Sequence, residues 1–175
     1  MPFEQIKARL LERPMNLYQV LAVAIGVLVN MMDGYDLLAL AFAAPGLRRE
    51  WMLDAAQLGA LLSAGLLGMA FGAFGLSWVS DVLGRRVGTM INLAVMTVGM
   101  TAAAFAPSYE ILFAARLLTG IGIGAMTASI GSLVFELASR KRREVSLGFV
   151  TAAFPVGTIL GGSVSIWLLE FGWRA

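Results

Sequence analysis

Five long apolar runs limit what this 175-residue chain can fold into. About 20 helical residues, at 1.5 Å each, cross the ~30 Å hydrocarbon core of a bilayer. Runs of that length lie at about residues 17–44, 58–79, 87–106, 111–133 and 145–169. We therefore expect an all-α membrane protein, with a cytoplasmic N-terminal segment at residues 1–16 and a bundle of five transmembrane helices at residues 17–175.

The composition supports this class and excludes several others. Hydrophobic residues make up 59% of the chain and charged residues only 14%, and the mean hydropathy is +0.81. The chain has no Cys and no His, which excludes disulfides, thiolate nucleophiles, Cys/His metal sites and the usual imidazole proton carrier. No nucleophile has an evident base, so we expect neither an enzyme nor a cofactor. The basic residues cluster at the ends of apolar runs, which argues against nucleic-acid binding.

The short connections between the runs predict the orientation in the membrane. Lys and Arg are enriched in cytoplasmic connections. Nine basic residues fall on one side of the predicted bundle: Lys7, Arg9, Arg13, Arg85, Arg86, Arg140, Lys141, Arg142 and Arg143. Only Arg48, Arg49 and Arg174 fall on the other. The N-terminus is therefore expected in the cytoplasm, and the first run is too long to be a removed signal peptide.

Two carboxylates interrupt the first apolar run. Asp33 and Asp36 each cost about 2.5 to 3.5 kcal/mol at the centre of a membrane helix, which predicts a use as an ion or substrate site. They lie about 60° apart around a helix, and Asn30 and Gly26 extend the same face. An alternative is that the helix breaks at Gly34, with Asp33 capping exposed amides and Asp36 in the outer headgroups.

Arg116 is the other ionisable residue well inside a run. Counting from the run ends places Asp33 about 24 Å and Arg116 about 22 Å from the cytoplasmic edge. We therefore hypothesise an ion pair between the first and fourth helices, which would lower the cost of both charges. The alternative is that Arg116 extends to the outer interface.

Glycines recur within the apolar runs at helical spacing. Gly65, Gly68, Gly72 and Gly75 form a stripe that favours close packing against a neighbouring helix. A second group, Gly120, Gly122 and Gly124, superficially matches a dinucleotide fingerprint, but no strand precedes it. Packing explains both groups better than ligand binding.

Three motifs carry a resemblance to a known family. Asp33-Gly34-Tyr35-Asp36 resembles the first-helix motif of the aromatic acid:proton symporter family, which belongs to the major facilitator superfamily. The segment Ser77 to Arg86 is similar to the superfamily signature between helices two and three. The segment Arg116 to Gly122 is similar to its fourth-helix motif. The resemblance covers almost the whole chain and corresponds to part of the N-terminal half of such a transporter.

The resemblance implies a fold and a cellular location. Such transporters have twelve spans in two halves with the substrate between them, so the sixth helix and the second half would be missing from this chain. It implies five helices of the N-terminal six-helix bundle, placed in the bacterial inner membrane as a multi-pass protein. A missing C-terminal half becomes a possible partner, beside the lipid bilayer.

The resemblance also implies roles for individual residues. Asp33, Asp36 and Arg116 would couple protons to the substrate, and Asn30 and Tyr35 are candidates for lining the cavity. The cytoplasmic gating loop would use the residues Asp81, Gly84, Arg85 and Arg86, although Arg85 and Arg86 could serve topology alone. Ser77 stands where Gly is usual and Val82 where a basic residue is usual. Pro155, Gly157, Gly161 and Gly162 do not reproduce the spacing of the antiporter signature, which favours symport.

Charge suggests how the motifs would work. Two ionised aspartates would repel an aromatic carboxylate, whereas desolvation and mutual repulsion favour their protonation, which would admit the anion. Arg116 could then bind the substrate carboxylate or help return the aspartates to the ionised form. The expected function is proton-coupled uptake of small aromatic acids of the benzoate or 4-hydroxybenzoate class, as part of a longer carrier. The alternative is a non-transporting membrane fragment or interaction partner.

Overall fold

All regular structure in the described part of the chain is helical. The computed structural model describes residues 15–139 and 142–168, except for the side chains of Ser77, Asp81 and residues 166–168. Five of its helical segments are long and apolar enough to cross a membrane: Leu17–Trp51, Ala55–Ser80, Arg85–Ala104, Tyr109–Leu137 and Arg143–Ser165. The prediction of an all-α membrane chain with five spans is confirmed.

The first helix, α2 (Leu17–Trp51), is longer than the apolar run that predicted it. It starts at a capping box formed by Asn16 and Gln19, and it continues through Pro45 to a last turn that carries Arg48 and Arg49. The predicted end at residue 44 is wrong by seven residues. A single proline removes one helical hydrogen bond, whereas basic side chains in a last turn interact favourably with the helix dipole. The helix therefore extends beyond the end of its apolar run.

The other spans end within four residues of their predicted limits. The second consists of α3 (Ala55–Phe71), a π-helical turn (Gly72–Leu76) and α4 (Ser77–Val82). The third is α5 (Arg85–Ala104), the fourth is α6 (Tyr109–Leu137), and the fifth is α7 (Arg143–Leu168). The N-cap of α3 is Asp54, whose carboxylate accepts a hydrogen bond of 2.7 Å from the Gln57 backbone.

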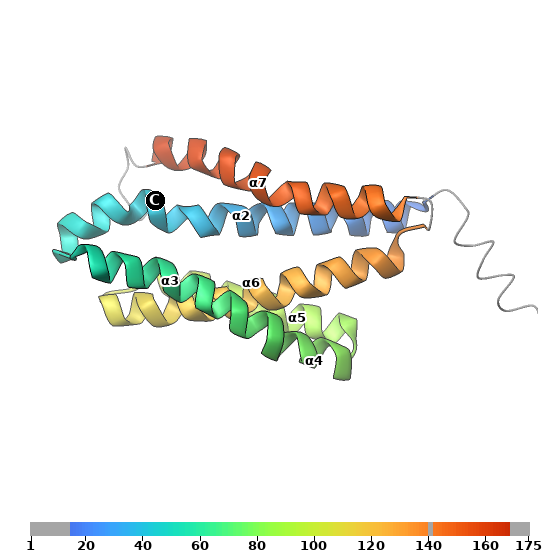
Figure 1. Cartoon of the computed structure of the whole chain (residues 1–175), viewed down its shortest axis with the longest axis horizontal. Helices are drawn as coiled ribbons and strands as arrows, with labels where there is room; N and C mark the ends of the chain where they lie inside the picture. Colours follow the sequence, from blue (N-terminus) through green and yellow to red (C-terminus); the bar gives the residue numbers. More distant parts are fainter. Residues whose placement is uncertain (1–14, 140–141, 169–175) are drawn as a thin grey trace, which may run out of the picture.

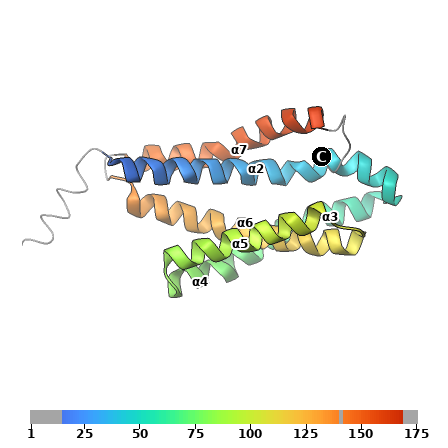
Figure 2. The same cartoon turned by 180° about the vertical axis from the view of Figure 1, so that it is seen from behind.

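The helices form two closely packed groups (Figures 1 and 2). In the first group α2 and α7 lie side by side. In the second group α6 packs extensively against α3 on one side and α5 on another. Contacts between the groups, which join α6 to α2 and α7 and join α3 to α2, are fewer. Asp33 and Asp36 of α2 and Arg116 of α6 lie where these groups meet.

Glycines make the contacts within the second group close. A Cβ atom added to Gly68 or Gly72 would clash with the backbone of α6, and the predicted packing role of these two residues is confirmed. A Cβ atom added to Gly65 or Gly75 would point into open space. Only two of the four glycines in the stripe therefore need to lack a side chain for the helices to pack. The wider π turn that begins at Gly72 changes the angular position of the residues after it, which turns Gly75 away from α6. The group Gly120, Gly122 and Gly124 packs against the backbones of α3 and α5.

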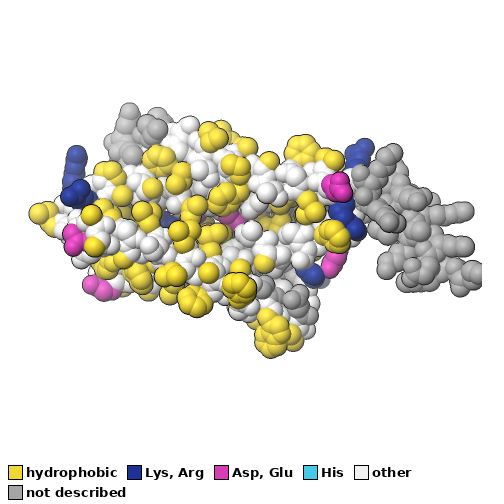
Figure 3. Space-filling model, viewed as in Figure 1, with side chains coloured by type: hydrophobic (Ala, Val, Ile, Leu, Met, Phe, Trp, Pro, Cys, Tyr) yellow, Lys and Arg dark blue, Asp and Glu magenta, His cyan; other side chains and the backbone are white. Residues whose placement is uncertain are grey.

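The surface is apolar between two charged ends (Figure 3). Yellow apolar side chains are spread along the length of the visible face, and the blue and magenta charged side chains gather mainly at the two ends of the long axis. Large apolar side chains such as Phe74, Trp78 and Ile159 are exposed. Exposed apolar surface of this extent fits a lipid environment.

The described basic residues are consistent with the predicted orientation but do not test it. Arg48 and Arg49 end α2, whereas Arg85 and Arg143 begin helices at the opposite end of the bundle (Figure 1). Several residues used in the orientation argument lie outside the described residues: Lys7, Arg9, Arg13, Arg140, Lys141 and Arg174. A cytoplasmic N-terminus stays a prediction.

Candidate functional site

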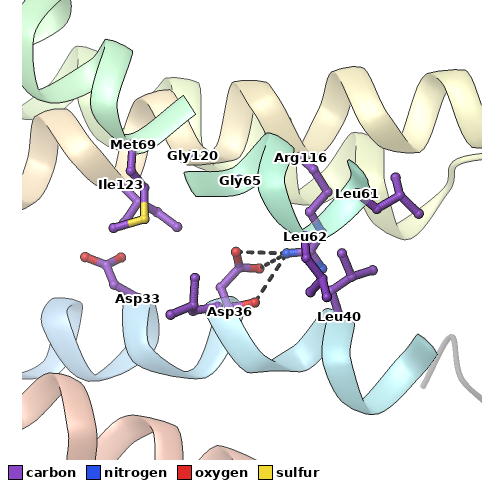
Figure 4. A pocket seen from close by; sticks show the side chains of 11 residues that line it. Asp33, Asp36, Leu40, Leu61, Leu62, Gly65, Met69, Arg116, Gly120 and Ile123 are labelled. Carbon is purple, nitrogen blue, oxygen red and sulfur yellow. Dashed lines mark hydrogen bonds and ion pairs between the residues drawn. The ribbon is translucent and has the colours of Figure 1, made fainter. Parts of the chain in front are cut away.

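Asp33 and Asp36 lie in an unbroken part of α2, which faces α3 and α6 at this level (Figure 4). The helix does not break at Gly34, so the alternative in which Asp33 caps free amides is wrong. Arg116 reaches toward them from α6. The three residues therefore come from the two helix groups, two from α2 and one from α6, and meet in one region inside the bundle.

Asp36 and Arg116 form an ion pair. The Nη1 atom of Arg116 lies 3.0 Å and 3.1 Å from the two carboxylate oxygens of Asp36 and 3.3 Å from its carbonyl oxygen. The side chains are only 15% and 13% exposed, respectively. Arg116 points to this partner rather than to the outer interface, so the interfacial alternative is wrong. Its Nε atom is buried and donates to no group in the described protein.

Asp33 is buried without a hydrogen-bond partner. Its exposed fraction is 0%, and neither carboxylate oxygen bonds to a group in the described protein. It lines a cavity of about 20 Å³ with Asp36 and Arg116. The other lining residues are Leu37, Leu40, Leu61, Leu62, Gly65, Met69, Gly120 and Ile123. The carboxylate therefore faces walls that are apolar apart from the neighbouring ion pair.

The expected ion pair between the first and fourth helices is present, but its carboxylate is Asp36, not Asp33. The predicted helix ends place Asp33 and Arg116 at about the same depth in the membrane. Asp33 and Asp36 differ in height by only about 4.5 Å, or three residues at 1.5 Å each. An uncertainty of 2 to 4 residues in those ends exceeds this difference, so counting could not choose between the two aspartates.

Asn30 and Tyr35 do not line the cavity beside Asp33. Asn30 donates a buried hydrogen bond of 2.6 Å to the Val150 carbonyl oxygen in α7. Tyr35 contacts Gly161 of α7 and borders a separate apolar groove of about 280 Å³. Both side chains contact α7 in this structure, and their role in lining a substrate cavity stays a prediction.

Sequence reasoning missed two sets of polar contacts between helices. Thr158 of α7 bonds to the carbonyl oxygen of Gly34, between the two aspartates. A second cluster joins three helices: the Ser129 hydroxyl lies 3.2 Å from the Ser80 hydroxyl and 3.3 Å from the Asn92 amide. These residues could have been noticed in the sequence as uncharged polar residues within apolar runs. Such side chains form hydrogen bonds with neighbouring helices in a membrane.

Comparison with known proteins identifies the family. The sequence model for the Major Facilitator Superfamily matches residues 23–175. The chain belongs to the major facilitator superfamily. This is a superfamily of secondary transporters rather than enzymes, in agreement with the expectation that the chain is not an enzyme. The fold prediction of a partial N-terminal bundle and the family resemblance are both confirmed.

Curated relatives are named as carriers of aromatic acids. The chain is 34% identical to the gallate transporter of Pseudomonas putida over 93% of its own length and 36% of the relative. It is 32% identical to the 4-hydroxybenzoate transporter PcaK of Pseudomonas aeruginosa over 97% of its length and 38% of the relative. It is 29% identical to the gentisate transporter of Corynebacterium glutamicum over 87% of its own length and 35% of the relative. The chain thus spans little more than a third of these relatives.

The superfamily signature loop connects α4 to α5. Gly84 adopts a positive φ of 88°, which the turn into α5 requires and which glycine tolerates best. Arg85 forms an ion pair of 2.8 Å with Glu136 of α6, a partner that the sequence analysis did not identify. Arg86 is exposed, and the side chain of Asp81 lies outside the described residues. The gating role of this loop stays a prediction.

Proposed function

We propose that this chain forms part of a proton-coupled carrier that takes up small aromatic carboxylates across the bacterial inner membrane. The proposal places the N-terminus in the cytoplasm. The observation that carries it is the largely buried Asp36–Arg116 ion pair beside the unpaired carboxyl group of Asp33. The names of the relatives support the substrate class, because gallate, 4-hydroxybenzoate and gentisate are all hydroxylated benzoates.

Asp33 is the proposed site of proton uptake. An ionised carboxylate that has no partner is costly away from water, and a bound proton removes most of that cost. Asp33 is fully buried among apolar residues, and Asp36 rather than Asp33 holds the nearby arginine. We infer that Asp33 carries a proton while it is enclosed and releases it when the site opens to the cytoplasm.

Arg116 is the proposed group that binds the substrate carboxylate. A guanidinium group has five N–H donors, and the contacts with Asp36 use only its Nη1 atom. A charged Asp36 competes with an incoming anion for this arginine, whereas a protonated Asp36 holds it less strongly. Proton binding and anion binding would then favour each other, and this coupling is reciprocal.

The aromatic ring requires surface beyond the cavity beside Asp33. That cavity of about 20 Å³ has room for a single water molecule and not for a benzoate ring. Carriers of this superfamily bind substrate between two halves. We propose that a second half, supplied by a longer chain or by association, completes the binding surface over Arg116.

Uptake by reconstituted protein tests the proposal. Labelled 4-hydroxybenzoate, gallate, gentisate and benzoate would be offered to proteoliposomes that contain this chain alone, under an imposed inward proton gradient. Asp33→Asn and Asp36→Asn are the test variants. Asp54→Asn is the matched control, because Asp54 is an exposed helix cap and asparagine caps helices equally well.

The outcomes separate the two functions that the sequence left open. Uptake that follows the gradient, disappears in Asp33→Asn and survives in Asp54→Asn supports a coupled carrier. Equal uptake by the wild type and Asp33→Asn overturns the role of Asp33. No uptake by a correctly inserted chain contradicts transport by this chain alone, and the same variants in a longer chain that includes a second half then decide the role of Asp33. A lone species near 18.6 kDa in native membranes favours the non-transporting fragment.

A further inference from the structure

The backbones of α2 and α7 touch at the turn that carries the carboxylates. Gly34 follows Asp33 directly, and a Cβ atom added to it would clash with the Phe154 carbonyl oxygen of α7. From the other side, a Cβ atom on Gly157 would clash with the Met31 carbonyl oxygen of α2. The position of this turn of α2 is therefore fixed against α7 more closely than side-chain packing alone would allow.

A hydroxyl group crosses this contact. The Thr158 hydroxyl lies 3.0 Å from the Phe154 carbonyl oxygen in its own helix and 3.1 Å from the Gly34 carbonyl oxygen in α2. The Thr151 hydroxyl, two turns earlier in α7, bonds to the Leu147 carbonyl oxygen of its own helix. Thr158 thus makes an interhelical bond at the residue between the two aspartates, in addition to the usual bond within a helix.

The surrounding helix gives this bond a mechanical role. Pro155 lies three residues before Thr158 and cannot donate the helical hydrogen bond to the Thr151 carbonyl oxygen. Toward its C-terminal end α7 leans away from α2 (Figures 1 and 2), and the apolar groove of about 280 Å³ between these helices lies there. Thr158 lies where the half of α7 that follows Pro155 begins, and its bond is one of the contacts that join that half to α2.

We propose that Thr158 is a positioning residue for Asp33. Its hydroxyl holds α7 against the Gly34 carbonyl group and so keeps the Asp33 side chain buried in the cavity that it lines. The charged groups that face this cavity are Asp33, Asp36 and Arg116, and α7 contributes none of them. The inference deepens the proposed function, on which its relevance to proton coupling rests.

Chemical labelling of the 175-residue chain in bilayers tests the proposal without a transport assay. Dicyclohexylcarbodiimide modifies carboxyl groups in apolar surroundings, and mass spectrometry of peptides gives the rate at each aspartate. Thr158→Val removes the hydroxyl group at constant shape, and Thr158→Ser retains it. Thr151→Val is the matched control, because it removes a hydroxyl bond from the same helix at an exposed position away from Asp33.

The expected result is a rise in labelling of Asp33 of about threefold in Thr158→Val, which corresponds to ~0.6 kcal/mol for an interhelical hydrogen bond. Thr158→Ser and Thr151→Val should label at the wild-type rate. An unchanged rate in a folded Thr158→Val chain overturns the proposal, as does an equal rise in Thr151→Val. Thr158→Ala replaces the valine variant if that variant does not insert.

The labelling result and the uptake result can fail separately. If Asp33→Asn retains uptake while Thr158→Val exposes Asp33, the proposed function is wrong but the positioning role holds. If Asp33→Asn abolishes uptake while Thr158→Val leaves the labelling unchanged, the positioning role is wrong and the coupling site holds. Each result therefore tests one inference.

Discussion

Arg116→Leu should destabilise the folded bundle more than the double variant that also neutralises its partner. In the single variant Asp36 stays in the bundle without the arginine that makes three close contacts with it. In the double variant Arg116→Leu/Asp36→Asn no charge of the pair remains. The comparison isolates the cost of an uncompensated carboxylate from the loss of packing.

The magnitude follows from burial. Removal of one partner from a buried ion pair costs about 3 to 5 kcal/mol, whereas replacement of both partners by neutral groups is often close to neutral. The two side chains are 13% and 15% exposed, so we expect a loss of about 3 kcal/mol for the single variant. The double variant should recover about 2 kcal/mol of this loss.

Equilibrium unfolding in mixed detergent micelles measures both values. Arg85→Leu is the matched control, because the Arg85–Glu136 pair is 33% and 53% exposed and such pairs contribute about 0 to 1 kcal/mol. Equal stability of the single and double variants would refute the reasoning, since the Asp36 carboxylate would then carry no cost of its own. A loss in Arg85→Leu as large as in Arg116→Leu would show that burial does not control the effect.

Three further predictions concern packing, backbone conformation and orientation. Gly124→Ala should lower the free energy of unfolding by about 1 to 3 kcal/mol, because its Cβ atom would meet the α3 backbone, whereas Gly131→Ala on the same helix points into open space and should have little effect. Gly84→Ala should cost about 1 kcal/mol in the same assay, because a side chain at φ 88° is strained; an unchanged stability would contradict this. The chain has no cysteine, so single-cysteine variants report topology: in intact cells an impermeant maleimide should label Met52→Cys and leave Glu136→Cys unlabelled, and the reverse pattern would invert the predicted orientation.

The sequence predicted the spans because a bilayer sets the length of a helix directly. All five runs contain a helix that can cross a membrane, and the largest error was at the end of α2. That helix extends past Pro45 because backbone hydrogen bonds and the basic residues of its last turn stabilise it there. Neither depends on the length of the apolar run. The sequence also singled out Asp33, Asp36 and Arg116, because an ionisable group in an apolar run is costly enough to be noticed without a structure.

The partners of these groups were decided by tertiary structure alone. Whether Arg116 bonds to Asp33 or Asp36 depends on a relative shift of α2 and α6 that is smaller than the uncertainty of any predicted helix end. That α7 covers Asn30 and Tyr35, and that Thr158 reaches the Gly34 carbonyl group, depends on which faces of α2 and α7 meet. The length and polarity of each run are local properties of the chain, whereas the rotation of one helix against another is fixed only by the contacts that all of them make together.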